Sequence, residues 1–290
     1  MLIQAAGRGN DSAGVGLYAD PAGLPEGIAT VSALYDARPA PEAAKAVELI
    51  GRSLGPVAAE RAGQTTVFTA TASPLALEAA VREALPEAVV ISAGHSLTVL
   101  KGTGEPAELA QAWNLAARSG WQGVAHTRMA TESAVTPGGS HPFSVGPDQC
   151  LIHNGSFSNH ETLRKELAAL GVGFDSLNDT EVGARYIAHR LAAGADMREA
   201  LTDLTKHFDG FYTLLVSSAS SFAIVRDAIA CKPAIVAETP DLVAVASEYR
   251  YLTGMPGIDN ALIFEPNPEV VYVWERSEVQ QPSSTLPALV

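Results

Sequence analysis

The spacing of apolar residues in the first half of the chain predicts strands and helices. Strands rich in β-branched and apolar residues are predicted at 13–19, 65–71, 88–92, 96–101 and 121–128. Helices are predicted at 40–54, 73–85 and 105–118, the second with Ser73 as N-cap and Pro74 in its first turn. Residues 20–30 are rich in Pro and Gly, which predicts a loop.

The second half separates its helices from its strands. Helices are predicted at 160–170, 179–193 and 196–208. Strands are predicted at 149–153, 211–217, 221–226, 234–238, 242–247 and 270–275. Because elements of one kind cluster in runs, the sequence predicts an α+β fold and not alternating βαβ units. None of the candidate chemical motifs falls in residues 20–110, so we expect an insertion or a small subdomain there.

Composition narrows the function classes. Of the 290 residues, 47% are hydrophobic, enough for a sizeable core. The 32 acidic and 19 basic residues give a net charge of −13, which disfavours binding to nucleic acid. No apolar stretch approaches the ~18 residues of a membrane span, and no basic segment followed by an apolar run marks a signal peptide.

The cysteines and histidines predict neither a disulfide framework nor a metal site. Cys150 and Cys231 are the two cysteines, and neither lies in a CxxC pair, so we expect a reducing compartment, the cytoplasm. Cys150 adjoins an apolar strand and is expected to be buried, whereas Cys231 precedes Lys232, which could activate its thiol. The histidines lack metal-ligand spacing, and we interpret His153 and the others as structural.

Arg128 ends a predicted strand and is followed by Met129-Ala130-Thr131. A guanidinium at this place can hold a carboxylate through two parallel hydrogen bonds. Position alone favours the simpler alternative, a surface arginine that pairs with a neighbouring acid.

Asn154-Gly155 follows the apolar residues 150–152. Taken alone, the dipeptide is typical of a turn, and this interpretation is the stronger one in isolation. The functional alternative is an oxyanion hole. In that case the Asn154 amide and the Gly155 N–H both donate, and the missing Cβ leaves room for a substrate.

Asn178-Asp179-Thr180-Glu181 opens a predicted helix. The spacing of Asn178 and Glu181 is that of a capping box, which explains the motif without any ligand. The functional alternative is that Asp179 binds an ammonium group. Both roles are compatible, because capping by Asn178 leaves the Asp179 carboxylate available.

In order and approximate spacing, these segments resemble the class II glutamine amidotransferases. The resemblance rests on Arg8-Gly9-Asn10-Asp11-Ser12-Ala13-Gly14, Gly123-Val124-Ala125-His126-Thr127-Arg128-Met129-Ala130-Thr131, Ser140-His141-Pro142-Phe143, Ile152-His153-Asn154-Gly155, Asn178-Asp179-Thr180-Glu181-Val182 and Arg226-Asp227-Ala228 with Lys232-Pro233. Met129 with Glu132-Ser133 is most similar to the stand-alone glutaminase subunits of glutamate-synthase-like enzymes, including N-methylglutamate synthase.

The resemblance implies a fold and a set of roles. The fold would be the four-layer αββα sandwich of the N-terminal-nucleophile hydrolases with an inserted α/β segment, as one domain over residues 1–280, followed by a flexible tail at 281–290. Arg128 would hold the α-carboxylate of glutamine, with Thr131 also at the substrate, and Asp179 would hold the α-amino group. Asn154 and Gly155 would form the oxyanion hole, while Arg8 and His126 would support the site.

The resemblance also implies a nucleophile that this sequence does not provide. In the family an N-terminal cysteine attacks the amide and its own α-amine acts as base, but this chain begins Met1-Leu2-Ile3-Gln4. We therefore expect the first strand and the nucleophile to be missing, and the chain as written to be inactive.

One hypothesis is a start codon placed too late, with Met-Cys-Gly encoded upstream in a glutaminase that feeds ammonia to a partner synthase subunit. The other is a non-catalytic glutamine-binding or scaffolding subunit. Neither implies a cofactor for this chain.

Overall fold

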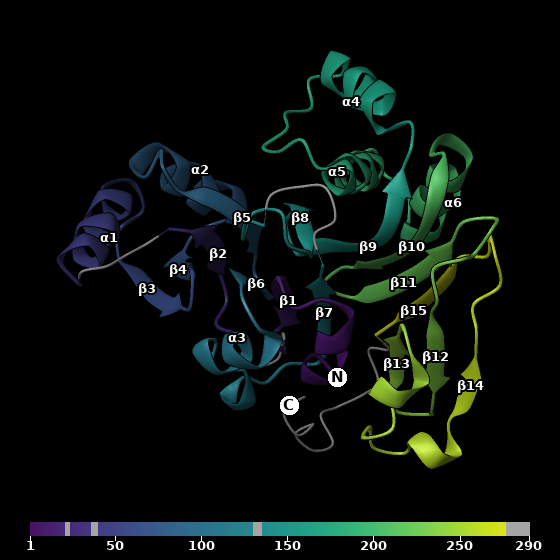
Figure 1. The fold of residues 1–290 in the computed structure, drawn as a ribbon. Coiled ribbons are helices and arrows are strands. Elements are labelled where there is room, and N and C mark those ends of the chain that lie inside the picture. Colours follow the sequence, from purple (N-terminus) through teal and green to yellow (C-terminus); the bar gives the residue numbers. More distant parts are fainter. Residues whose placement is uncertain (21–23, 36–39, 130–134, 277–290) are drawn as a thin grey trace. The chain divides into compact units, whose positions relative to one another are not determined.

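The computed structural model describes residues 1–20, 24–35, 40–129 and 135–276. The chain divides into two compact units (Figure 1). The N-terminal unit runs from Ala6 to Cys150 and includes Leu2. The C-terminal unit covers the described residues 151–276 and includes Met1 and Ile3–Ala5. The boundary falls inside strand β9 (Gln149–Phe157).

The N-terminal unit contains two antiparallel sheets and three α-helices among its described residues. The strands are β1 (Ser12–Tyr18), β2 (Ile28–Leu34), β3 (Val57–Ala62), β4 (Thr65–Thr71), β5 (Val89–Gly94), β6 (Leu97–Thr103), β7 (Gln122–Arg128) and β8 (Phe143–Gly146). The helices are α1 (Ala40–Leu54), α2 (Pro74–Ala84) and α3 (Pro106–Ala112), after an opening 3₁₀ helix η1 (Ile3–Arg8). The sheet orders are β6-β1-β7 and β3-β4-β2-β5.

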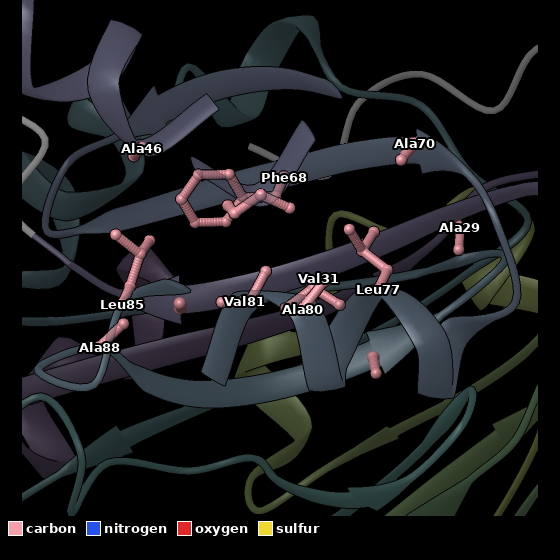
Figure 2. Close-up of a cluster of buried hydrophobic side chains, with 13 residues drawn as sticks. Ala29, Val31, Ala46, Phe68, Ala70, Leu77, Ala80, Val81, Leu85 and Ala88 are labelled. Atoms are coloured by element: carbon pink, nitrogen blue, oxygen red, sulfur yellow. The ribbon is translucent and has the colours of Figure 1, made fainter. Parts of the chain in front are cut away.

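Helices α1 and α2 supply the core of the four-stranded sheet. Leu77, Ala80 and Val81 of α2 gather with Val31 and Phe68 of the strands (Figure 2). Because burial of each large apolar side chain stabilises by about 1.5–3 kcal/mol, this cluster can hold β2–β5 together. The next strand, β6, pairs with β1 instead, in register Val15↔Leu100. The expected insertion or subdomain at 20–110 stays a prediction, as does the single domain over 1–280.

The C-terminal unit combines helices and antiparallel strands. The helices are α4 (His160–Ala169), α5 (Asp179–Ala192) and α6 (Met197–His207). The strands that follow are β10 (Gly210–Ser217), β11 (Ser221–Arg226), β12 (Ile235–Glu238), β13 (Val243–Ala246), β14 (Leu262–Phe264) and β15 (Tyr272–Glu275). One sheet has the order β15-β11-β10-β9, with β8 next to β9, and a smaller one has the order β13-β12-β14. Helix α5 packs between α4 and α6 (Figure 1).

The α+β class is confirmed, and most predicted elements are present. The helix over 40–54 and the strand over 65–71 have the predicted bounds. Ser73 caps α2 as predicted, accepting a hydrogen bond from the Ala76 N–H at 3.2 Å. Along the described residues, no helix is both long and apolar enough to cross a membrane.

Several elements differ from the prediction. The loop predicted for residues 20–30 is wrong at its end, because β2 begins at Ile28. Strands β2, β3, β8 and β14 were not predicted. The helix predicted over 105–118 ends at Ala112, where Trp113 is fully buried and Asn114 adopts a left-handed conformation with φ 49°. A left-handed residue cannot continue an α-helix, so a short 3₁₀ turn follows.

Candidate functional site

Asn154 and Gly155 lie inside β9, so the turn interpretation of this dipeptide is wrong. Gly155 has a φ of 144°, and a Cβ built on it would lie 2.0 Å from the Phe211 carbonyl oxygen and 2.7 Å from the Tyr212 Cα. Strands β9 and β10 are neighbours in one sheet and approach too closely there for a side chain. Asn-Gly therefore serves a close contact between strands, and not a chain reversal.

The candidate oxyanion-hole groups are accessible. Asn154 is half-buried and Gly155 is exposed. Along the described residues, the Asn154 carboxamide forms no side-chain hydrogen bond with another part of the protein. An exposed backbone beside an uncommitted amide is the arrangement that an oxyanion hole requires.

The first turn of α5 is joined to β9 by Asp179. Asn178 is the N-cap, as predicted, and its side chain accepts from the Thr180 N–H at 2.9 Å. The Asp179 Oδ2 atom accepts from the Phe157 N–H at 2.9 Å, and 21% of the Asp179 side chain remains exposed. This hydrogen bond places the Asp179 carboxylate beside the strand that carries Asn154 and Gly155.

Glu181 does not complete the predicted capping box, and this half of the prediction is wrong. Its side chain, 3% exposed, accepts from the backbone N–H groups of Asp175 at 2.8 Å and Ser176 at 2.7 Å. It also accepts from the Ser176 hydroxyl at 2.6 Å and pairs with Arg185 at 3.1 Å. The carboxylate thus orders the loop before α5 instead of reaching back to the Asn178 N–H.

His153 is a buried residue of β9, and its ring contacts the first turn of α5. Its Nδ1 lies 3.1 Å from the Thr180 Oγ1 and 3.8 Å from the Asp179 Oδ2. Its ring stacks on Phe157, with 4.2 Å between ring centroids. Burial lowers the pKa of His153 from 6.5 to about 4. The Asp179 charge opposes this shift, and the Lys232 charge adds to it. The imidazole is therefore neutral near pH 7.

The turn after β11 brings a lysine to the same region. Asp227 is buried and accepts from the N–H groups of Tyr212, Ile229 and Ala230 at 2.8, 2.8 and 3.2 Å. Lys232 follows this turn, with its Nζ 5.1 Å from the centroid of the Phe211 ring. Burial and nearby acids, Asp227 first among them, raise the pKa of Tyr212 to about 12. In the sequence, Asp227 and Lys232 stood out only as part of the family resemblance.

The N-terminal unit gathers the other three motifs. Arg128 ends β7 opposite Ser12 of β1, and its carbonyl accepts from the Asp11 N–H at 3.2 Å. A Cβ on Gly14 would lie 2.0 Å from the carbonyl oxygen of His141. His126 pairs with Gly14 in the sheet, and the rings of His126 and His141 lie 4.5 Å apart. Segments separated by more than 100 residues therefore meet around β1.

The remaining predicted residues can also be placed. Arg8 ends η1 and is exposed, whereas Arg128 and His126 are half-buried. Thr131 lies outside the described residues. Arg128, Arg8 and His126 belong to the N-terminal unit, and Asn154, Gly155 and Asp179 belong to the C-terminal unit. The glutamine pocket that the two sets would share stays a prediction.

The cysteines follow the expected pattern. Cys150 is buried with its Sγ 3.5 Å from the Tyr18 hydroxyl, and Cys231 is exposed. Both are free thiols. Within the described ranges, no group of three or more His, Cys, Asp or Glu is arranged to hold a metal ion.

Comparison with known sequences gives consistent matches. A family model for the glutamine amidotransferase domain matches residues 126–254. The glutamine amidotransferase-like protein GlxB of Rhizobium meliloti (strain 1021) is 42% identical over 279 residues, covering 96% of this chain and 91% of that protein. A putative glutamine amidotransferase of Methanothermobacter thermautotrophicus (strain Delta H) is 31% identical over 195 residues, covering 67% of this chain and 63% of that protein.

Solved structures extend the likeness to the fold. A structure described as the allosteric regulatory enzyme of purine biosynthesis has a TM-score of 0.59 and 17% identity over 96% of this chain. A glutamine phosphoribosylpyrophosphate amidotransferase from B. subtilis, complexed with ADP and GMP, has a TM-score of 0.50 and 22% identity over 63% of this chain. The match covers 45% and 41% of those two chains, respectively.

The sequence match to the Rhizobium protein extends over nearly the whole of both chains, and the fold agrees with the resemblance that the motifs indicated. The chain therefore belongs to the class II glutamine amidotransferase family.

Proposed function

We propose that this protein binds glutamine and hydrolyses its side-chain amide to glutamate and ammonia. The observation that carries the proposal is the hydrogen bond of 2.9 Å between Asp179 and the Phe157 N–H. It holds a possible acceptor for an ammonium group against β9, the strand that also carries Asn154 and Gly155. A carboxylate beside two candidate N–H donors suits an amino acid whose amide carbonyl becomes an oxyanion.

The proposed roles extend the family resemblance to residues of this chain. Asp179 would bind the α-ammonium group, and Arg128 would bind the α-carboxylate through its two-pronged guanidinium. Thr131 would lie at the substrate, and Arg8 and His126 would support the site. The Asn154 amide and the Gly155 N–H would stabilise the oxyanion, each contributing on the order of 3 kcal/mol to the transition state.

The attacking group separates two candidate functions. The family reaction uses a thiolate together with the α-amine of the same terminal residue. Cys150 and Cys231 are internal, and Cys150 is also buried, so neither can supply that pair. A second candidate, a subunit that binds glutamine without turning it over, needs no such pair. Ammonia release on adding glutamine distinguishes the two.

The ammonia acceptor would belong to another protein or segment. The 279 residues aligned with GlxB are amidotransferase-like sequence, so we propose a partner subunit of a glutamate-synthase-like complex. The proposed compartment is the cytoplasm, where thiols stay reduced, because Cys150 and Cys231 are both free.

Titration calorimetry and thermal unfolding with glutamine test the proposal. At ~100 times its dissociation constant, glutamine should raise the free energy of unfolding by ~2.7 kcal/mol. Asp179→Asn should weaken binding by at least about tenfold, because the ammonium group loses a charge-assisted hydrogen bond. Asp259→Asn, an exposed position in the same unit, is the matched control.

Arg128→Lys tests the proposed contact between Arg128 and the α-carboxylate of glutamine. Lysine keeps the charge but cannot form two parallel hydrogen bonds to a carboxylate, so glutamine should bind more weakly while glutamine amide analogues lacking the α-carboxylate are unaffected. Saturating glutamine that changes neither heat nor stability would refute both candidate functions.

A further inference from the structure

His153 lies between the two segments that carry the proposed site. It precedes Asn154 on β9 and is only 3% exposed. Its Nδ1 is 3.1 Å from the hydroxyl of Thr180, in the first turn of α5. The same Thr180 hydroxyl donates a hydrogen bond of 3.3 Å to the Asp179 Oδ1. The three side chains form a short series that ends at the carboxylate proposed to bind the substrate.

The single hydroxyl hydrogen of Thr180 decides the direction of these hydrogen bonds. An ionised carboxylate only accepts, so the Thr180 hydroxyl donates to Asp179 and its oxygen accepts from His153. The Nδ1 of His153 must then carry a hydrogen. The 3.8 Å between this Nδ1 and the Asp179 Oδ2 agrees, because an N–H is attracted to a carboxylate oxygen at that distance.

The second ring nitrogen fits the same assignment. The Nε2 of His153 is buried and has no hydrogen-bond partner among the described residues. Burial lowers the pKa of His153 to about 4, so one nitrogen carries no hydrogen near pH 7. Besides Asp179, the ionisable groups near the ring are Lys232 after β11 and Tyr212 on β10. The Lys232 charge favours the neutral imidazole.

We propose that His153, as a neutral imidazole with its hydrogen on Nδ1, is a positioning residue that fixes the Asp179 carboxylate through Thr180 for the ammonium group of glutamine. This inference rests on the proposed function for the identity of the ligand. It assigns His153 a role beyond packing, although its ring also stacks on Phe157.

Two substitutions separate the hydrogen bond from the packing. The amide of His153→Asn can place an N–H donor where Nδ1 lies, whereas the amide of His153→Gln reaches toward the position of Nε2. Both remove the stacked ring, so both lose the packing with Phe157. We expect His153→Asn to keep the glutamine dissociation constant within about threefold of wild type and His153→Gln to raise it about tenfold, the effect of one lost hydrogen bond.

Thr180 provides a matched pair. Thr180→Ser keeps the hydroxyl and should bind glutamine like wild type, whereas Thr180→Val keeps the shape without the hydroxyl and should bind about tenfold more weakly. In the His153→Gln background, Thr180→Val should add little, because the series is already broken. Equal weakening in His153→Asn and His153→Gln, or full affinity in Thr180→Val, would overturn the inference.

Nitrogen-15 NMR of the histidine ring tests the tautomer without any ligand. We expect His153 to show a protonated Nδ1 and a bare Nε2, unchanged between pH 8 and pH 5. A hydrogen on Nε2, or titration near the ordinary pKa of about 6.5, would overturn the inference even if glutamine binds. Conversely, wild-type protein that fails to bind glutamine while His153 shows the expected tautomer would refute the proposed function alone.

Discussion

At the scale of single residues, Gly155 is the position with the least freedom to change. Its φ of 144° is a region that L-residues rarely adopt, and its hydrogen points at the backbone of β10. Gly155→Ala should therefore lower the free energy of unfolding by at least about 3 kcal/mol, through strain and steric overlap together. Urea unfolding measures the change.

Gly173→Ala is the control for this substitution, because a Cβ at Gly173 meets nothing within 4 Å. Its stability should stay within about 1 kcal/mol of wild type. If both variants unfold at the same urea concentration, the close approach of β9 and β10 is wrong.

His153 makes stability depend on pH. Its pKa is about 4 when folded and 6.5 by its ordinary value, so between these pH values only the unfolded chain binds the proton. The free energy of unfolding should fall as pH drops from 6.5 toward 4, by up to about 3 kcal/mol. Urea unfolding midpoints of wild type and His153→Gln, measured over this pH range, give the contribution of His153 as the difference between the two pH profiles. Parallel profiles would contradict the prediction.

The residues of the candidate site could be found from the sequence only in part. Asn154-Gly155 looks like a turn because the signal is local, whereas the neighbour that forbids a side chain, Phe211, lies more than 50 residues away. His153 was interpreted as structural, since nothing near it in sequence indicates the contact with Thr180. Asn178 was correctly predicted as a cap, because capping depends on adjacent residues.

At the scale of elements, the loop before α5 depends on one buried carboxylate. Glu181→Gln keeps the shape of the side chain but turns an amide N–H₂ toward backbone donors and leaves Arg185 with a weaker partner. We expect a loss of about 2–4 kcal/mol in the free energy of unfolding. Faster hydrogen exchange at the Asp175 and Ser176 amides would localise the effect.

The capping box of α6 offers the comparison for that variant. Glu199 accepts from the Asp196 N–H at 3.1 Å on an exposed surface. Glu199→Gln should change the free energy of unfolding by less than about 1 kcal/mol, since water can replace a weakened hydrogen bond to the exposed Asp196 N–H. Equal effects at Glu181 and Glu199 would show that burial of the first carboxylate does not matter.

Elements with a regular apolar face were predicted well, and those without one were missed. Helix α1 has such a face and was predicted at its observed bounds. Strand β3 (Val57–Ala62) is largely exposed at a sheet edge, so its residues carry no alternation. In β2, consecutive residues Ser32 and Ala33 are both fully buried, and a strand covered on both faces has no period of two.

At the scale of the whole molecule, the spacing of apolar residues predicted the strands but not which strands pair with each other. β1 pairs with β6 and with β7, and the paired residues lie at least 79 positions further along the chain, the smallest separation being that of Tyr18 and Leu97. Such pairs are selected by the packing of the complete sheet and not by neighbouring residues. The order of the motifs along the chain nevertheless indicated the family, because this order can be read from the sequence without knowing which strands pair.

Net charge governs how the molecule behaves toward its own copies. The charge is −13 at pH 7, and the sequence pI is about 4.9. Solubility should reach a minimum near pH 5, where repulsion between molecules vanishes. Light scattering across pH 4–8 at fixed protein concentration measures this, and a maximum of scattering near neutral pH would contradict it.

The contrast between the two cysteines has a practical use. With Cys150 buried and Cys231 exposed, a maleimide dye should attach to one thiol per molecule under native conditions. That thiol adjoins Lys232, whose ammonium lies over the ring of Phe211. A fluorophore attached there would report glutamine arrival as a change in emission, from protein that needs no engineered labelling position.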